Sequence, residues 1–229
     1  MATLQFHLET AIVFEGEHRI TETREPNARL PARFLLARGN DAVAWAVRTD
    51  VKPEIANELD ELAASEPRHT GNWEAPPIHA ARYEELLAMD FAEVDGGPMF
   101  EFPAELVAPT DLAIVEVRSE RELATNFHGW VPGEISNGCA PVMAIVEDGA
   151  PVSICFSARR SRTGAVAGVD TGERYRGRGY AARVTAAWAL AIRARKMTPL
   201  YNTSWSNEAS RAVAKKLGLV TVGSCWSIS

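Results

Sequence analysis

The segment that most constrains the fold is Val169–Ala181, because it joins an apolar run to a helix-forming segment through two closely spaced glycines. The apolar run, Gly164–Val169, is short and has no helical periodicity, which predicts a buried strand. Tyr180–Arg195 is rich in Ala, Leu and Arg, and its large apolar residues recur at helical spacing. Gly177 and Gly179 are therefore expected on a strand-to-helix turn.

A turn of this kind suits an anion. Glycines have no Cβ, so they adopt positive φ readily and let the main chain approach a ligand closely. The first turn of the following helix offers unsatisfied amide donors and the positive end of the helix dipole, which together favour phosphate. Arg174, Arg176 and Arg178 add fixed positive charge with forked donors. An Arg-Gly pair can also be an ordinary turn, but a strand before and a helix after it favour a phosphate or pyrophosphate site.

The net charge of −6 conceals an asymmetry along the chain. Residues 159–216 hold 13 Lys and Arg against 3 Asp and Glu, a net charge of +10, and the remainder carries −16. A basic block within an acidic chain argues against a general nucleic-acid binder, which presents a broad basic face. It suits a compact anionic ligand, and the acidic remainder favours a cationic second substrate.

The composition is that of a globular protein without a membrane span. The chain has 229 residues, 46% of them hydrophobic, and no apolar run approaches the roughly 18 residues that cross a bilayer. Met1–Glu9 lacks the pattern of a secretory signal. Cys139, Cys155 and Cys225 are widely scattered, and the five histidines show no ligand spacing, so no disulfide framework and no metal site is predicted. We expect a cytoplasmic protein.

Two regions are expected. Residues 1–110 are predicted to form an α+β domain of unknown role, with a hairpin over Phe34–Ala37 and Ala42–Arg48, and with Asp95–Pro98 as a break before a short strand. Helices are predicted in this region over Pro53–Ala64 and Ile78–Met89. Residues 111–229 are predicted to form a second domain.

The second region alternates strands and helices. Ser119 with Glu122 three residues later predicts a capping box, and Glu147-Asp148-Gly149 predicts a hairpin turn. Gly218 is expected to end the last helix. The remaining predicted strands are Leu112–Val117, Pro141–Val146, Val152–Ser157, Leu200–Ser204 and Leu219–Ile228, and the remaining helices are Ser119–Phe127, Pro132–Asn137 and Asn207–Leu217.

The region from Leu112 to Ser229 resembles the GNAT superfamily, whose members transfer an acyl group from coenzyme A to an amine. The family's pyrophosphate motif, Arg/Gln-x-x-Gly-x-Gly/Ala, is matched by Arg176–Ala181. Asn207 opens a helix whose end, Lys215–Leu219, is similar to the family's Lys-Leu-Gly-Phe, and the order of elements agrees. Val169-Asp170-Thr171 and the Asn-x-x-Ser of Asn207–Ser210 are similar to the branch typified by zwittermicin acetyltransferase.

The resemblance implies an α+β fold with a GNAT-type mixed, splayed central sheet flanked by helices, preceded by a smaller α+β amino-terminal domain. It implies acetyl-CoA or another acyl-CoA as co-substrate, without a metal. The pantetheine arm would lie where the strand ending at Thr171 splays from its neighbour, and Asn207 would hydrogen-bond that arm or cap its helix. The residues implied in cofactor binding are Val169, Thr171, Arg174, Arg176, Gly177, Arg178, Gly179, Tyr180, Ala181 and Asn207.

The catalytic groups are less clearly marked, because the chain departs from the family pattern. Many members carry a tyrosine seven residues after the Asn, where this chain has Ala214, and some carry a glutamate at the position of Ala165. Asp170 is one of the nearest acids, and burial beside the thioester would raise the pKa of its carboxyl group toward that of a usable base. Alternatively, it is a strand-end residue that faces away from the site. Glu134 is a second candidate base, and Ser210 is a candidate proton donor to the thiolate or an ordinary helix serine.

The sequence therefore predicts an acyl-CoA-dependent N-acyltransferase that acts on the primary amine of a small molecule in a ternary complex. No nucleic-acid or membrane partner is expected, and the oligomeric state is left open. One alternative is a catalytically silent GNAT-fold module that binds coenzyme A, since Ala165 and Ala214 remove two functional groups. A second is an RNA-associated protein that uses Arg176–Tyr180; it predicts salt-dependent RNA affinity, which the acidic bulk opposes.

Overall fold

The computed structural model describes residues 3–26, 30–69, 71–88, 93–107, 109–110 and 113–229. The chain packs into two compact units. Unit 1 comprises Met1–Phe100, Asn202–Asn207 and Thr221–Ser229, and unit 2 comprises Glu101–Tyr201 and Glu208–Val220.

These units do not follow chain order as the predicted division into residues 1–110 and 111–229 does. The last strand, β11 (Val220–Ile228), pairs antiparallel with β3 (Phe34–Arg38), so most of it belongs to unit 1. The pairing sets Ile228 opposite Phe34, and both side chains are fully buried. The division into an amino-terminal domain and an acyltransferase domain stays a prediction.

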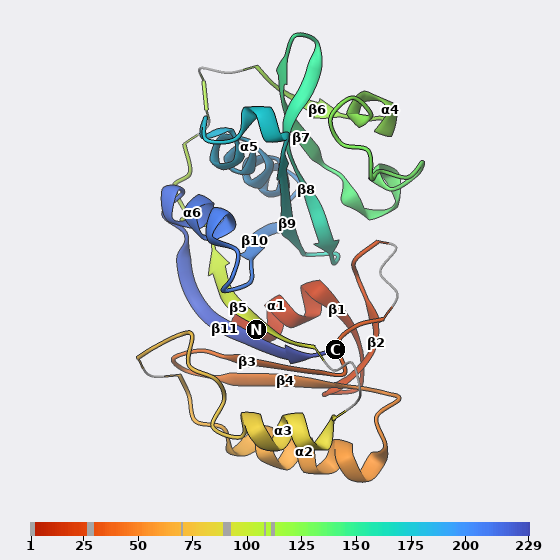
Figure 1. Cartoon of the computed structure of the whole chain (residues 1–229), viewed down its shortest axis with the longest axis vertical. Helices are drawn as coiled ribbons and strands as arrows, with labels where there is room; N and C mark the ends of the chain where they lie inside the picture. Colours follow the sequence, from red (N-terminus) through yellow and green to blue (C-terminus); the bar gives the residue numbers. More distant parts are fainter. Residues whose placement is uncertain (1–2, 27–29, 70, 89–92, 108, 111–112) are drawn as a thin grey trace. The chain divides into compact units, whose positions relative to one another are not determined.

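Unit 1 is a sheet with helices on both faces (Figure 1). Its strands lie in the order β1-β2-β4-β3-β11-β5. Besides β3 and β11 its elements are α1 (Thr3–Ala11), β1 (Ile12–Glu15), β2 (Arg19–Thr23), β4 (Val43–Arg48), α2 (Pro53–Ser65), α3 (Ala80–Leu86) and β5 (Val94–Glu101). The predicted hairpin is confirmed as β3 and β4, which pair antiparallel from Phe34 opposite Val47 to Arg38 opposite Val43.

The two faces of this sheet are covered by different helices because neighbouring strand residues point in opposite directions. Leu36 packs with α2 and α3, and Ala37 packs with Leu4 and Leu8 of α1. The predicted helices Pro53–Ala64 and Ile78–Met89 are seen as α2 and a shorter α3, and Met89 lies outside the described residues.

The predicted break at Asp95–Pro98 is wrong, since these residues lie inside β5. A Cβ added to Gly97 would overlap the carbonyl group of Thr203, and the amide of Trp205 donates to the carbonyl of Gly96 at 2.9 Å. Gly97 is therefore required by close main-chain contact with the segment after β10 (Thr198–Asn202), and not by a turn. A Cβ on Gly96 would lie 3.0 Å from the carbonyl oxygen of Cys225 in β11.

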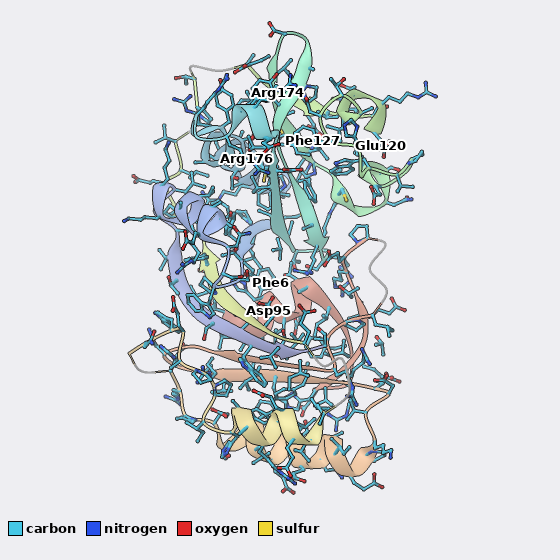
Figure 2. All side chains as sticks on the ribbon, in the orientation of Figure 1. Phe6, Asp95, Glu120, Phe127, Arg174 and Arg176 are labelled. Carbon is cyan, nitrogen blue, oxygen red and sulfur yellow. The ribbon has the colours of Figure 1, made fainter. Side chains whose placement is uncertain are left out.

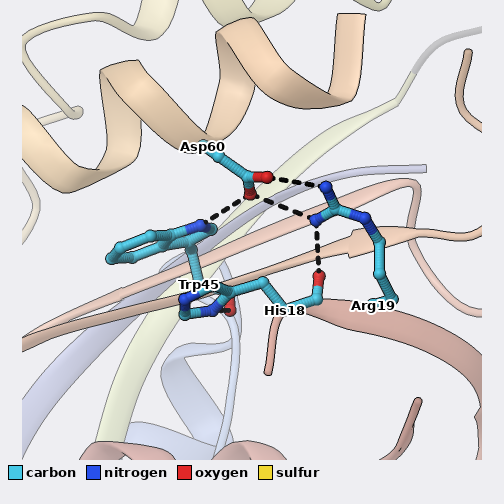
Figure 3. Close-up of polar contacts among 4 residues, drawn as sticks. All are labelled: His18, Arg19, Trp45 and Asp60. Atoms are coloured by element: carbon cyan, nitrogen blue, oxygen red, sulfur yellow. Dashed lines mark hydrogen bonds and ion pairs between the residues drawn. The ribbon is translucent and has the colours of Figure 1, made fainter. Parts of the chain in front are cut away.

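A polar cluster fastens α2 to the sheet of unit 1 (Figure 3). Asp60 of α2 accepts from the indole Nε1 of Trp45 at 2.9 Å and from both terminal nitrogens of Arg19. His18 stacks on Trp45 with ring centroids 4.2 Å apart. A bidentate Arg–carboxylate pair fixes orientation as well as distance, so this cluster sets how α2 crosses β4.

Unit 2 contains the strand-to-helix segment Val169–Ala181. Its strands lie in the order β10-β9-β8-β7-β6, where β9 and β10 are parallel and the other neighbours are antiparallel. The elements are β6 (Ile114–Val117), α4 (Glu120–Leu123), a π-helical turn (Ile135–Cys139), β7 (Val142–Glu147), β8 (Ala150–Arg160), β9 (Gly164–Thr171), a 3-10 turn (Glu173–Tyr175), α5 (Tyr180–Ala194), β10 (Thr198–Asn202) and α6 (Glu208–Lys216).

Both faces of this sheet are covered as well. The helix α5 packs against β7, β8 and β9 through Trp188 and other buried residues, and α6 packs on α5. On the opposite face Ile154 packs with Leu123 and Ile135, from α4 and the π-helical turn. The chain is thus an α+β protein with a mixed sheet flanked by helices, as predicted.

Local predictions in this unit are confirmed closely. Ser119 and Glu122 form the capping box of α4, although the helix ends at Leu123 and not at Phe127. Asp148 and Gly149 both have positive φ at the turn between β7 and β8, which is the geometry of a tight hairpin. Gly218 has a φ of 63° after α6. Leu112 of the predicted strand Leu112–Val117 lies outside the described residues.

Candidate functional site

The predicted bend lies between β9 and α5 and has the expected conformation. Gly177 and Gly179 both have a φ of 77°, a left-handed conformation that favours glycine. Gly179 is the N-cap residue of α5 and supplies no side-chain cap. The main chain therefore turns from strand to helix with its first helical amides facing no capping group.

The amides at this bend are unsatisfied. Within the part of the chain that the structure describes, the main-chain N–H groups of residues 177–182 donate to no protein acceptor, and the first bond of α5 runs from Arg183 to the carbonyl of Gly179. A row of donors at a helix start, with the positive end of the helix dipole behind it, attracts an anion. The bend is thus a cradle without an occupant from the protein itself.

The arginines around the cradle divide into two kinds. Arg174 and Arg176 are exposed on the segment between β9 and α5 (Figure 2), and Arg176 Nε donates to the carbonyl of Thr171 at 3.3 Å. Arg178 instead pairs with Glu147 at 3.3 Å and lies over the ring of Tyr175. Arg174 and Arg176 are therefore available to a ligand, and the Arg178 side chain is committed to the protein.

Glu147, the last residue of β7, also accepts from the hydroxyl of Tyr180. Its two carboxylate oxygens thus hold the side chains on either side of Gly179. Arg178 and Tyr180 were predicted as cofactor-binding residues, and the geometry leaves their amides for that role while their side chains fix the loop. Sequence reasoning missed Glu147, whose place in a hairpin turn gave no local sign of this contact.

A lysine from another helix reaches the cradle. A Cβ atom added to Gly179 would lie 2.6 Å from Nζ of Lys216, the last residue of α6. In the sequence Lys216 is only part of the closing motif, and nothing in its neighbourhood along the chain indicates that its ammonium group meets the bend.

The predicted splay of the sheet is present beside the cradle. The register of β9 with β10 covers only Gly164–Val166, although β9 continues to Thr171. On its other side β9 stays paired with β8 as far as Thr171 opposite Ser153. Val169 and Thr171 therefore lie on the stretch of β9 that has parted from β10, where an extended ligand can pair with the main chain.

The candidate bases are placed differently from expectation. Asp170 is exposed, so the burial that was expected to prepare its carboxyl group is absent. Glu134 accepts from the amide of Val131 at 2.8 Å, which ties its carboxylate to its own turn. Ala165 and Ala214 are both buried, which leaves the two family positions without a functional group.

Ser210 has a defined partner. Its hydroxyl lies 2.7 Å from the hydroxyl of Tyr201, which is 2% exposed at the splayed end of β10. Burial raises the pKa of Tyr201 to about 12, so this phenol keeps its proton at neutral pH. Asn207 is exposed and directly precedes α6.

Other site types find no support in the described residues. None of the His, Cys, Asp and Glu side chains among them gather in threes in a way that could hold a metal ion. None of the helices placed by the structure is long and apolar enough to cross a bilayer. The three cysteines form no disulfide.

Comparison with known proteins gives a family match in the carboxyl-terminal part of the chain. Residues 116–225 match the family model described as GNAT acetyltransferase. This part of the chain is therefore similar to the GNAT family. The resemblance drawn from Arg176–Ala181 and Asn207–Leu219 is thereby confirmed, and the finer similarity to the zwittermicin branch stays a prediction.

Three solved structures are similar to this chain, and one of them reaches a TM-score above 0.5. A functionally unknown conserved protein from Staphylococcus epidermidis is similar with a TM-score of 0.51 and 12% identity over 94% of both chains. A GCN5-related N-acetyltransferase-like protein from Streptococcus suis gives a TM-score of 0.49 at 16% identity, over 86% of this chain and 84% of that one. A protein described as a GNAT-family acetyltransferase, from Novosphingobium aromaticivorans, gives 0.49 at 21% identity; the match covers 59% of this chain and 64% of that one. No curated protein matches the chain.

Proposed function

We propose that this GNAT protein is an acyl-CoA-dependent N-acyltransferase that transfers the acyl group, most simply acetyl, to a primary amine of a small molecule. The observation that carries the proposal is the run of unsatisfied amides over residues 177–182, at the strand-to-helix bend of a GNAT fold. Free donors, a helix dipole and exposed arginines are the features that a diphosphate requires.

The residues present fit acetyl-CoA. The amides of Gly177–Ala181 would hold its diphosphate, with Arg174 and Arg176 beside them. Gly177 and Gly179 have no Cβ, which leaves the main chain of the cradle open to close approach by a ligand. Main-chain groups at Val169 and Thr171, on the splayed part of β9, would pair with the pantetheine arm. Asn207 would hydrogen-bond the same arm.

When bound, acetyl-CoA supplies an acyl group activated as a thioester. The chain's contribution is to hold that group beside a neutral amine, and proximity of this kind is worth up to roughly 7–11 kcal/mol in favourable cases. Main-chain amides near Val169 would donate to the oxygen on which negative charge develops. The amine would attack the thioester carbon directly within the ternary complex, so that the new C–N bond replaces the C–S bond, the thiolate leaves, and no side chain carries the acyl group.

Two protons must also move. Asp170 is exposed at the end of β9, where it could take the proton of the attacking amine and pass it to water. Ser210 could donate a proton to the leaving thiolate, since its hydroxyl is coupled to the protonated phenol of Tyr201. Glu134 is the weaker base, because its carboxylate already accepts a main-chain bond.

We further infer a small-molecule amine as acceptor, a cytoplasmic location, and neither a nucleic-acid nor a membrane partner. The rival function is a GNAT-fold module that binds coenzyme A without catalysis. It is favoured by one observation, the buried Ala165 and Ala214 at the two positions where many relatives carry functional groups.

One experiment separates the two functions. The protein is titrated with acetyl-CoA by calorimetry, and release of free thiol is then followed across a panel of small amines. Binding with thiol release for at least one amine supports the acyltransferase. Binding without release for any amine supports the silent module, and absence of binding contradicts both.

A further inference from the structure

The side chain of Lys216 meets the cradle from α6. Its Nζ lies so close to Gly179 that any Cβ at that position would approach it to 2.6 Å. The two residues are distant in sequence, and the contact depends on the packing of α6 against α5. The φ of 77° at Gly179 favours glycine, and the ammonium group lies on the side toward which a Cβ would point.

The position is electrostatically unusual. Lys216 is exposed, and within the described chain its ammonium group forms no ion pair or hydrogen bond with a protein group. Around it are the unsatisfied amides of residues 177–182 and the positive end of the α5 dipole. A cation beside unsatisfied amide donors and the positive end of a helix dipole is repelled unless an anion lies between them.

We propose that Lys216 binds a phosphate group of the acyl-CoA, so that the anion is held between the loop amides and this ammonium group. The inference rests on the proposed function, because it takes the cradle as the coenzyme site. The shared chemistry is a phosphate oxygen, which either the diphosphate or the 3′-phosphate of coenzyme A can supply.

This role makes Lys216 a specificity residue for the acyl carrier. Main-chain amides recognise a phosphate by geometry, whereas an ammonium group adds a charge that only an anionic carrier can use. Thioesters of pantetheine, which have no phosphate, would gain nothing from Lys216. The site would therefore select nucleotide-bearing carriers over the free pantetheine arm.

The test measures dissociation constants by calorimetry for coenzyme A, 3′-dephospho-coenzyme A and pantetheine. The variants are Lys216→Gln and, as matched control, Lys215→Gln, which removes the same charge from the neighbouring exposed residue of α6. Lys216→Gln should weaken coenzyme A roughly tenfold or more, with no change for pantetheine and none in Lys215→Gln. The KM for acetyl-CoA should rise by the same factor, with kcat unchanged.

The two nucleotide ligands identify the phosphate. Equal weakening of both in Lys216→Gln assigns the contact to the diphosphate, and weakening of coenzyme A alone assigns it to the 3′-phosphate. Three results would overturn the inference: an unchanged affinity of Lys216→Gln for coenzyme A, an equal loss of coenzyme A affinity in Lys215→Gln, or an equal loss of affinity of Lys216→Gln for pantetheine. If the unaltered protein binds no coenzyme A, the proposed function fails first, which keeps the two failures distinct.

Discussion

The most informative perturbation is Gly179→Asp, because it places a carboxylate in the cradle itself. At a distance of about 4 Å and an effective dielectric constant of about 20, a unit charge repels a unit charge by about 4 kcal/mol. This predicts a loss of acetyl-CoA affinity of roughly a thousandfold. The new carboxylate would also accept from the free amides and pair with Lys216, so it would occupy the site that the anion needs.

The same geometry predicts a small effect on folding. The left-handed φ costs about 1–2 kcal/mol for a residue with a Cβ, and an aspartate in place of glycine at an N-cap position recovers only a few tenths of a kcal/mol. The free energy of unfolding should therefore fall by only about 1 kcal/mol, which urea titration measures alongside calorimetry with acetyl-CoA.

Gly16→Asp is the matched control. Gly16 has a φ of 73° and open space around it, and the substitution adds the same charge in unit 1. It should leave acetyl-CoA affinity unchanged. Undiminished affinity in folded Gly179→Asp would refute the assignment of the cradle, because no coenzyme diphosphate could remain there beside a carboxylate.

Three further predictions concern other parts of the chain. Gly97→Ala should destabilise the protein by about 3 kcal/mol and lower the Tm by roughly 6–12 °C in a thermal melt, because the added methyl group would overlap a main-chain carbonyl. Glu147→Gln should tighten acetyl-CoA binding about two- to threefold by calorimetry, because it removes a half-exposed carboxylate beside the cradle and releases Arg178. Weaker binding would contradict this and show that fixing the loop matters more. Burial lowers the pKa of His7 from 6.5 to about 4, so the unfolded chain binds this proton first as the pH falls. The free energy of unfolding should therefore fall by about 3 kcal/mol between pH 6.5 and 4. Urea titrations across this range should show a smaller fall in the free energy of unfolding for His7→Gln, and an equal fall in both proteins would contradict the lowered pKa of His7.

Much of this protein is determined by its sequence. The hairpin turn at Asp148 and Gly149, the capping box of Ser119, and the strand-to-helix bend at Gly177 and Gly179 all appear where local patterns predicted them. Each is governed by interactions within a few residues, namely φ preference, side-chain capping and hydrophobic periodicity. The family motif at the bend is local in the same sense, so the fold of this region and the bend with its unsatisfied amides could be anticipated.

Only the tertiary structure decided which groups surround that cradle. Glu147 holds Arg178 from a strand that ends 31 residues earlier, Lys216 reaches Gly179 from another helix, and Asp170 turns out exposed where burial was expected. Sequence spacing fixes the periodicity of an element but not the neighbours that its faces meet, because these depend on how helices and strands pack. The residues that tune the charge of the site therefore come from contacts between elements, which no local pattern encodes.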